Sequence, residues 1–182
     1  MSETEFAIGR YCGVTFAGLK VASMVNLRRG ERDVVVRLAR GFRRRGFCFV
    51  CLRACGERRV LYVYHEERLR GLLFSPDVRA FLEGFGYRYE TVGEAVSQLR
   101  ARMNALGAAF PHEIGVFLGY PLGDVRGFIA DPAGCLFCGA WKVYQDEACA
   151  RRTFERYKRC EVCICRHMQR GRSLAQIFNI VS

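Results

Sequence analysis

The sequence lacks the features of a membrane, secreted or disordered protein. No apolar run approaches the ~20 residues that cross a bilayer, and residues 1–6 do not form the charged-then-apolar pattern of a secretion signal. Hydrophobic residues make up 51% of the chain, which excludes intrinsic disorder. Linkers, internal repeats and low-complexity tracts are also missing. We therefore expect a single domain over residues 1–182 that stays in the cytoplasm.

Lysine, histidine and tryptophan are scarce. Of the 29 basic residues only Lys20, Lys142 and Lys158 are lysine, and all the others are arginine. The chain has three histidines and a single tryptophan, Trp141. Where generic positive charge suffices, this sequence uses arginine, so a lysine indicates a position that needs a compact ammonium group.

Cysteine is abundant, with ten residues in the chain. A small secreted protein of this composition would form disulfides. This chain is long enough to bury a core without them and has no export signal, so we expect free thiols in a reducing compartment.

Hydrophobic spacing and capping signals predict an α+β fold, with a small sheet of about three strands surrounded by helices. The strands are a hairpin over residues 47–64 and a third strand over 135–144. Helices are predicted over residues 15–27 and 31–45, as a short pair within 110–131, over 147–169, and from Ser173 onward. Two further helices are predicted from their start signals. One runs from Ser75-Pro76 to Gly84 or Gly86, and the other from Thr91, which forms a capping box with Glu94, to about residue 107.

The segment from Pro111 to Asp124 is the densest in residues that carry chemistry. It holds His112, Glu113 and Asp124 together with glycines that permit close approach of a ligand. A histidine at a helix start changes charge near neutral pH. The alternative is a tight helix corner in which the glycines serve packing and His112 caps the helix. A zinc-protease motif is excluded, because position 116 is valine rather than a second histidine.

Cys12 is predicted just before or within the first turn of a helix, where the dipole favours a reactive thiolate. It could then act as a nucleophile with His112 as its base and Glu113 or Asp124 orienting the imidazole. The alternative is a small buried hydrophobic residue. We expect Lys20, Asp124, Trp141 and Lys142 to bind a ligand, and the segments around these residues to converge on one concave surface.

The spacing Cys135-x-x-Cys138 after a glycine is typical of a metal-ligand pair, which leaves zinc, iron–sulfur or haem open as cofactors. Other cysteine pairs fall within predicted strands or helices. Arginine clusters at 43–45 and 151–172 predict, at most, nonspecific binding to nucleic-acid phosphates, since no reading motif is present.

Three segments carry a family resemblance: CGVTFAGLK from Cys12, FPHEIGVFLGYPLGDVRGFI from Phe110, and WKVY from Trp141. With them the chain resembles an uncharacterised family of small proteins of anaerobic bacteria, known only as a domain of unknown function. The family names no reaction, so the resemblance implies no site residues.

Three hypotheses about function follow. The first is a small-molecule or enzymatic site built from Cys12, Lys20, His112, Glu113, Asp124 and Lys142. The second is a noncatalytic protein that binds a metal, haem or redox partner through thiols. The third is nonspecific nucleic-acid binding. The sequence predicts no membrane partner and no particular oligomeric state.

We predict that nearly all ten thiols are free in the native protein, because the chain carries no export signal. Thiol titration of the protein, denatured under argon, measures this directly. Two or more stable disulfides would contradict the prediction of a reducing compartment.

Overall fold

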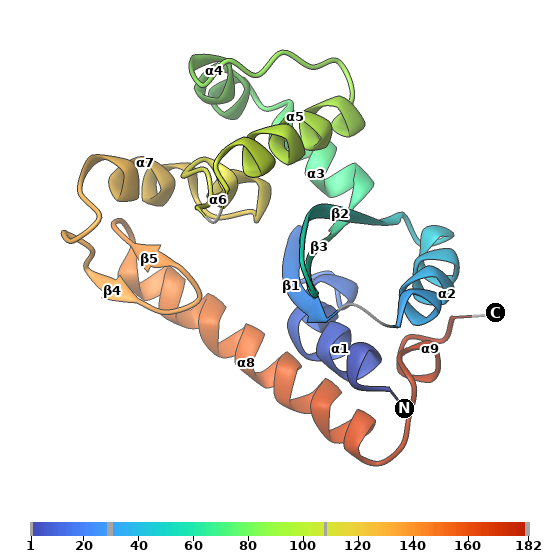
Figure 1. The fold of residues 1–182 in the computed structure, drawn as a ribbon. Helices are drawn as coiled ribbons and strands as arrows, with labels where there is room; N and C mark the ends of the chain where they lie inside the picture. Colours follow the sequence, from blue (N-terminus) through green and yellow to red (C-terminus); the bar gives the residue numbers. More distant parts are fainter. Residues whose placement is uncertain (1, 29–30, 108, 181–182) are drawn as a thin grey trace. The chain divides into compact units, whose positions relative to one another are not determined.

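The computed structural model describes residues 2–28, 31–107 and 109–180 and has the predicted α+β fold (Figure 1). Its elements follow the chain in the order α1 (Glu3–Phe16), β1 (Ala22–Arg28), α2 (Arg32–Arg43), β2 (Phe47–Cys55), β3 (Arg58–His65), α3 (Glu66–Leu73), α4 (Pro76–Gly84), α5 (Val92–Ala105), α6 (Ile114–Phe117), α7 (Leu122–Ala130), β4 (Phe137–Cys138), β5 (Lys142–Val143), α8 (Glu147–Gln169) and α9 (Leu174–Ile177).

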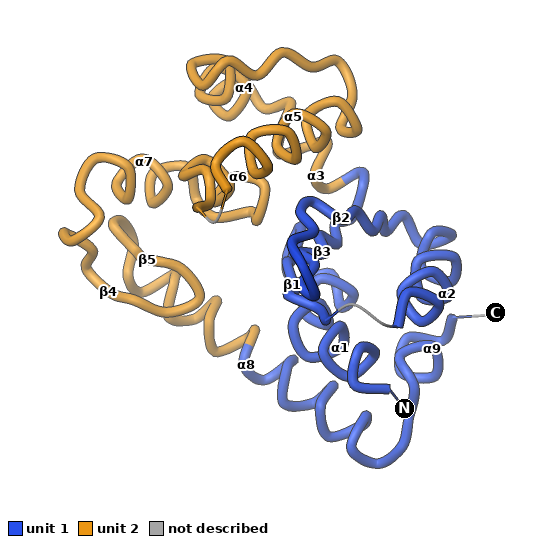
Figure 2. Tube along the Cα trace, viewed as in Figure 1, with its two compact units in different colours: residues 1–67, 158–182 blue, residues 68–157 orange. Residues whose placement is uncertain are grey.

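The chain divides into two compact units (Figure 2). Unit 1 comprises residues 1–67 and 158–182, and unit 2 comprises residues 68–157. The second boundary falls inside α8, so this helix contributes residues to both units. The single domain expected over residues 1–182 stays a prediction.

Unit 1 is built on a three-stranded antiparallel sheet of order β1-β3-β2. The predicted hairpin is confirmed: β2 and β3 pair antiparallel across a two-residue turn that begins at Gly56, whose φ is 52°. Helices α1 and α2, the end of α8 and α9 supply apolar side chains to one core with the sheet. Phe16 of α1 lies near its centre and stacks on Phe42 of α2, with 3.9 Å between ring centroids.

The helix predicted over residues 15–27 is wrong. Helix α1 ends at Phe16, Gly18 takes a positive φ of 73°, and residues 22–28 form strand β1. The spacing of the apolar residues 16, 19, 24 and 27 fits a helix locally. Pairing of β1 with the full length of β3 satisfies the backbone groups instead, and that pairing involves residues far away in the sequence.

Unit 2 is mainly helical, and its local signals act as predicted. Thr91 and Glu94 form a capping box at the start of α5. Ser75 occupies the N-cap position of α4 with Pro76 at the first helical position, although the Ser75 hydroxyl donates to the carbonyl of Leu72 and does not cap the helix. The short helices α6 and α7 flank the turn at Gly119, as the sequence indicates.

The third strand predicted over residues 135–144 is also wrong. This segment folds back on itself, so that β4 and β5 pair only with each other, Phe137 opposite Val143 and Cys138 opposite Lys142. The sheet of unit 1 receives its third strand from β1. The aromatic and β-branched bias was a correct sign of extended structure, but it carries no information about the pairing partner.

All ten cysteines carry free thiols. Within residues 2–28, 31–107 and 109–180, no helix is both long and apolar enough to cross a membrane.

Helix α7 packs against the segment after β5 through glycines one turn apart. A Cβ atom at Gly127 would lie 2.4 Å from the Cγ atom of Tyr144, and one at Gly123 would lie 2.0 Å from the amide oxygen of Gln145. Gly127 therefore has no room for a side chain, because the atoms in the way belong to the base of the Tyr144 side chain, whereas those at Gly123 are the flexible end of Gln145. By contrast, a Cβ atom at Gly71 of α3 would meet nothing within 4 Å.

We predict that Gly127→Ala lowers the free energy of unfolding by roughly 1–3 kcal/mol, because the new methyl group overlaps the Tyr144 ring. Gly71→Ala is the matched control, since it makes the same change in another helix of unit 2 without a clash. It should raise the stability by up to about 1 kcal/mol. Urea unfolding of both variants measures the difference, and equal effects would contradict the close approach.

Candidate functional site

A cavity of about 530 Å³ in unit 2 brings together four residues that the sequence singled out: His112, Asp124, Trp141 and Lys142. His112 precedes α6, Asp124 lies in the first turn of α7, and Trp141 and Lys142 come from the turn and strand of the β4–β5 ribbon. The other residues that line the cavity are Ala109, Phe110, Pro111, Ile114, Gly115, Tyr120, Val125, Phe128 and Ala140.

Asp124 holds the cavity together. Its carboxylate is buried and accepts three hydrogen bonds from the ribbon and the residues that follow it. The indole Nε1 of Trp141 donates to Oδ2 at 2.7 Å, and the backbone N–H groups of Tyr144 and Gln145 donate to Oδ1 at 2.8 and 2.9 Å. The carboxylate therefore positions the tryptophan rather than offering its charge to a ligand.

The aromatic rings in the cavity lining are those of Phe110, Tyr120, Phe128 and Trp141. The Tyr120 and Trp141 rings stack with 5.1 Å between centroids and 27° between planes. The Phe128 ring meets the His112 imidazole edge to face at 5.5 Å. Burial raises the pKa of Tyr120, and the nearby Tyr157 adds to this effect, so the phenol stays neutral at physiological pH.

The polar edge of the cavity is formed by His112 and Lys142. The Lys142 ammonium donates a hydrogen bond to the carbonyl oxygen of Pro132 at 2.7 Å and lies 5.6 Å from the centroid of the Phe128 ring. The Pro132 carbonyl accepts a hydrogen bond from one of the three N–H groups of the ammonium, and this bond fixes the position of the Lys142 side chain. His112 is exposed to solvent at the cavity rim.

Glu113, the neighbour of His112, does not line this cavity. Its buried carboxylate accepts hydrogen bonds from the Tyr87 hydroxyl at 3.1 Å and from Nε of Arg102 at 2.5 Å. Burial raises the pKa of Tyr87, and the Glu113 charge raises it further. Glu113 thus joins α5, α6 and the segment after α4 in the interior of unit 2.

Cys12 and Lys20 lie in unit 1, so their convergence with the unit 2 residues stays a prediction. The placement of Cys12 at a helix N-terminus is wrong: it is in the second half of α1, inside the hydrophobic core, and is 0% exposed. Burial raises the pKa of its thiol to about 12. A protonated, buried thiol has the properties of a core residue and not those of a nucleophile.

Burial also lowers the pKa of Lys20 to about 8, and the Cys12 thiol acts weakly in the opposite direction. Lys20 follows α1 in the connection to β1 and is half-buried. Its ammonium therefore loses its proton more readily than that of an exposed lysine.

Cys135 is half-buried and Cys138 is exposed on strand β4. In the part of the chain that the structure describes, three or more cysteine, histidine, aspartate or glutamate side chains nowhere come together as a group able to hold a metal. The pair offers two thiols, half of the four ligands of a structural zinc site. Metal binding there stays a prediction.

Tyr120 and Phe128 belong to the cavity but were not predicted as site residues. Both lie in the long segment that carries the family resemblance, at positions where aromatic residues are equally compatible with a core. Charged and rare residues can be recognised in the sequence as candidates for a site, but apolar residues that line a cavity cannot be distinguished there from core residues.

We predict that Lys20 and Cys12 make stability depend on pH in opposite directions. Between pH about 8 and 10.5 the unfolded chain keeps a proton on Lys20 that the folded protein has lost, so Lys20 makes stability rise with pH. Between pH 9.0 and about 12 the folded protein keeps the Cys12 proton that the unfolded chain has lost, so Cys12 makes stability fall.

Urea unfolding of the wild type, Lys20→Met and Cys12→Ala across this range separates the two contributions. The stability of the wild type relative to Lys20→Met should rise from pH about 8 to 10.5. Its stability relative to Cys12→Ala should fall above pH 9.0. Differences that do not vary with pH would mean that neither group is desolvated as described.

Comparison with known proteins gives one match. A family model described as "Protein of unknown function (DUF3793)" matches residues 8–178. No curated protein and no solved structure matches the chain. The match confirms the resemblance to an uncharacterised family, while an origin in anaerobic bacteria stays a prediction. Because the match covers nearly the whole chain, this protein belongs to the DUF3793 family of proteins of unknown function.

Proposed function

We propose that the cavity of unit 2 binds a small, flat organic anion, such as an aromatic carboxylate. The observation that carries this proposal is the presence of His112, Lys142 and Trp141 on one largely apolar cavity that also includes the Tyr120 and Phe128 rings. Cavities of roughly 300–1,000 Å³ that are largely apolar, with a few polar groups, are typical of small-molecule sites. The cavity of about 530 Å³ lies in this range.

The aromatic lining favours a flat ligand. Tyr120 stacks on Trp141, and the hydrogen bond to Asp124 fixes the indole, so these rings are already ordered before a ligand arrives. Phe128 contributes a further ring on the side of His112 and Lys142. Preordered rings lose little conformational entropy on binding, which favours a ligand that stacks on them.

The charges favour an anion. Both oxygen atoms of Asp124 already accept hydrogen bonds, whereas Lys142 keeps N–H groups beyond the one that Pro132 accepts. Lys142 is anchored beside the Phe128 ring, at the border between the apolar surface and the polar edge. A carboxylate on an aromatic ligand would meet the ammonium there, in a charge-assisted hydrogen bond.

The proposal is one of binding. The residues that line the cavity include no cysteine, serine or threonine that could serve as a nucleophile, and Asp124 is engaged with the ribbon. Cys12 and Glu113 therefore have no role in it. The free thiols are consistent with a reducing compartment such as the cytoplasm, which we include in the proposal.

Trp141 is the only tryptophan, so its fluorescence reports on this cavity alone. We predict that 4-nitrobenzoate, whose nitro group quenches indole fluorescence, gives saturable quenching at lower concentration than the neutral 4-nitrobenzyl alcohol. The Lys142→Met variant should weaken 4-nitrobenzoate binding by roughly tenfold or more, the value of a charge-assisted hydrogen bond, and remove the preference for the acid. The matched control is Lys158→Met, which removes the same charge from unit 1 and should leave both affinities unchanged.

Thermal unfolding of each variant establishes that the fold is retained. Linear quenching, like that of free tryptophan, would contradict the presence of a binding site. Equal affinities for the acid and the alcohol in the wild type would contradict the choice of an anion. An equal loss in Lys142→Met and Lys158→Met would show general electrostatic attraction instead of a contact.

A further inference from the structure

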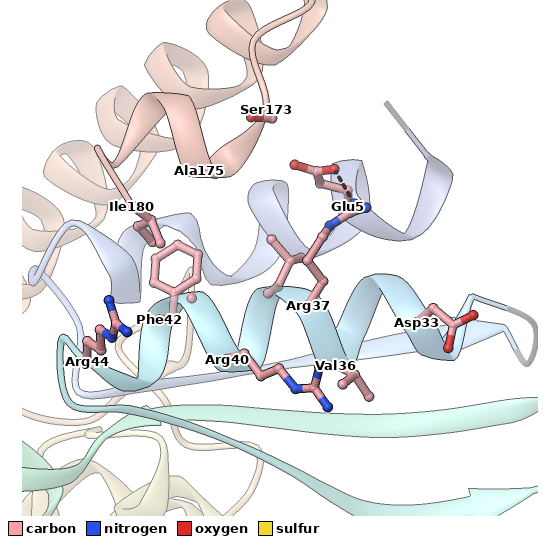
Figure 3. Close-up of a pocket in the computed structure, with 12 residues that line it drawn as sticks. Glu5, Asp33, Val36, Arg37, Arg40, Phe42, Arg44, Ser173, Ala175 and Ile180 are labelled. Carbon is pink, nitrogen blue, oxygen red and sulfur yellow. Dashed lines mark ion pairs between the residues drawn. The ribbon is translucent and has the colours of Figure 1, made fainter. Parts of the chain in front are cut away.

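The larger cavity of unit 1, of about 800 Å³, lies between helix α2 and the segment that carries α9 (Figure 3). Its lining includes the ion pair of Arg37 and Glu5, and also Arg40 and Arg44, whose side chains extend in different directions. The buried Glu5 carboxylate also accepts a hydrogen bond from the backbone N–H of Leu174 at 2.9 Å. The charged groups of this cavity therefore do not converge on one ligand, and Glu5 instead joins α1 to α2 and to the C-terminal segment.

A smaller hollow of unit 1, of about 440 Å³, lies on the surface of helix α8 and contains a thiol. Cys163 is exposed there, so its sulfur atom is accessible to a molecule in solution. The described residues that line the hollow include five basic side chains and no acid. All of the lining comes from one stretch of α8: Lys158, Arg159, Val162, Cys163, Arg166, His167 and Arg170.

The spacing along α8 surrounds Cys163 with basic side chains. Residues three or four positions apart on a helix are neighbours, with about 5–6 Å between their Cβ atoms. Arg159 therefore lies one turn before Cys163, and Arg166 and His167 lie one turn after it. A molecule that reaches the Cys163 sulfur atom meets basic groups on both sides along the helix.

The positive charge around this thiol is not neutralised by the same stretch of helix. Glu161 is the only acid in the stretch, and it pairs with Arg10 at 3.4 Å and with Lys158 at 3.8 Å. In the part of the chain that the structure describes, Arg166 and Arg170 form no ion pair. The hollow therefore attracts an anion to the exposed sulfur atom.

A second thiol, that of Cys160, lies one turn before Cys163. Cys160 is half-buried and packs against the hydrophobic core of unit 1. Burial raises the pKa of its thiol, and the neighbouring Cys163 raises it further. Helix geometry places the Cα atoms of residues three positions apart at about 5 Å, inside the range of about 4.4–6.8 Å that disulfides span. The two cysteines therefore differ in accessibility but are close enough to form a bond.

We propose that Cys163 and Cys160 are a redox-active pair that reacts with a low-molecular-weight disulfide carrying carboxylate groups. The basic neighbours of Cys163 select an anionic molecule, and the exposure of this thiol makes it the first to react. Cys160 reacts second, because it is less accessible to a molecule in solution and lies beside the sulfur atom of Cys163. This site is independent of the one proposed in unit 2.

The reaction consists of two exchanges between a thiolate and a disulfide. Cys163 loses its proton to solvent, and its thiolate attacks one sulfur atom of the small disulfide. A mixed disulfide forms, and the released half leaves as a thiolate that takes up a proton. Cys160 then loses its proton and attacks the Cys163 sulfur atom, so that a Cys160–Cys163 disulfide forms and the second half leaves as a thiol. The two protein thiols lose two electrons and two protons, which reduce the small disulfide to two thiols.

Oxidised glutathione, which has a net negative charge, and the cationic disulfide cystamine test the choice of an anion. Peptide mapping by mass spectrometry measures the rate at which each thiol is oxidised. Cys149 is the matched control, because it is exposed on the same helix but lies beside Asp146, whose carboxylate accepts a hydrogen bond from the Cys149 backbone N–H at 3.0 Å. The rate with oxidised glutathione, divided by the rate with cystamine, should be roughly tenfold or more higher at Cys163 than at Cys149.

The double variant Arg166→Gln/Arg170→Gln tests the role of the basic hollow. It should lower this rate ratio at Cys163 by roughly threefold or more, because it removes charge beside the thiol. The control is Arg32→Gln/Arg43→Gln, which removes the same charge from exposed positions on α2 and should leave the ratio at Cys163 unchanged. Thermal unfolding of the reduced variants establishes that unit 1 remains folded.

The Cys160→Ala variant separates the two steps. The wild type should end with a Cys160–Cys163 disulfide and no glutathione attached to either cysteine, whereas Cys160→Ala should accumulate the mixed disulfide on Cys163. Cys165→Ala, which removes another half-buried thiol from α8, should behave as the wild type. The proposal is overturned if Cys163 and Cys149 show the same rate ratio, if both double variants lower it equally, or if glutathione remains on Cys163 in the wild type.

Discussion

The candidate site depends on the hydrogen bonds that the buried carboxylate of Asp124 accepts. The carboxylate accepts hydrogen bonds from the Trp141 indole and from two successive backbone N–H groups, at Tyr144 and Gln145. An ionised carboxylate in the interior is costly unless its oxygen atoms are satisfied, and here three donors do so. The same bonds fix the short β4–β5 ribbon on α7, and thereby place Trp141 and Lys142 beside His112.

Two other buried carboxylates join segments in the same manner. Glu113 binds Tyr87 and Arg102 in unit 2, and Glu5 binds the backbone N–H of Leu174 in unit 1, 169 residues further along the chain. Each lies next to or within a cavity-forming region, but only Glu5 lines a cavity itself. In all three cases a buried acid connects separate segments of the chain.

The two cavities differ in their surfaces. Aromatic rings that stack on one another line the cavity in unit 2, which favours a flat ligand. The cavity in unit 1 is lined by Arg37, which pairs with Glu5, and by Arg40 and Arg44. The net charge of +11 thus acts at particular places as well as over the whole surface.

The sequence by itself determined the features that depend on neighbours within a few residues. The capping box of Thr91 and Glu94, the start of α4 at Ser75-Pro76, and the β2–β3 hairpin are all encoded by local hydrogen bonding and turn geometry. Only the tertiary structure decided which strand joins the sheet, because extended segments pair with whatever edge the fold presents. It also decided the roles of Glu113 and Asp124, which look alike in sequence: burial and the donors that surround each carboxylate come from distant residues. The same holds for Cys12, whose place inside the core of unit 1 depends on packing between α1, the sheet and α8 rather than on its own helix.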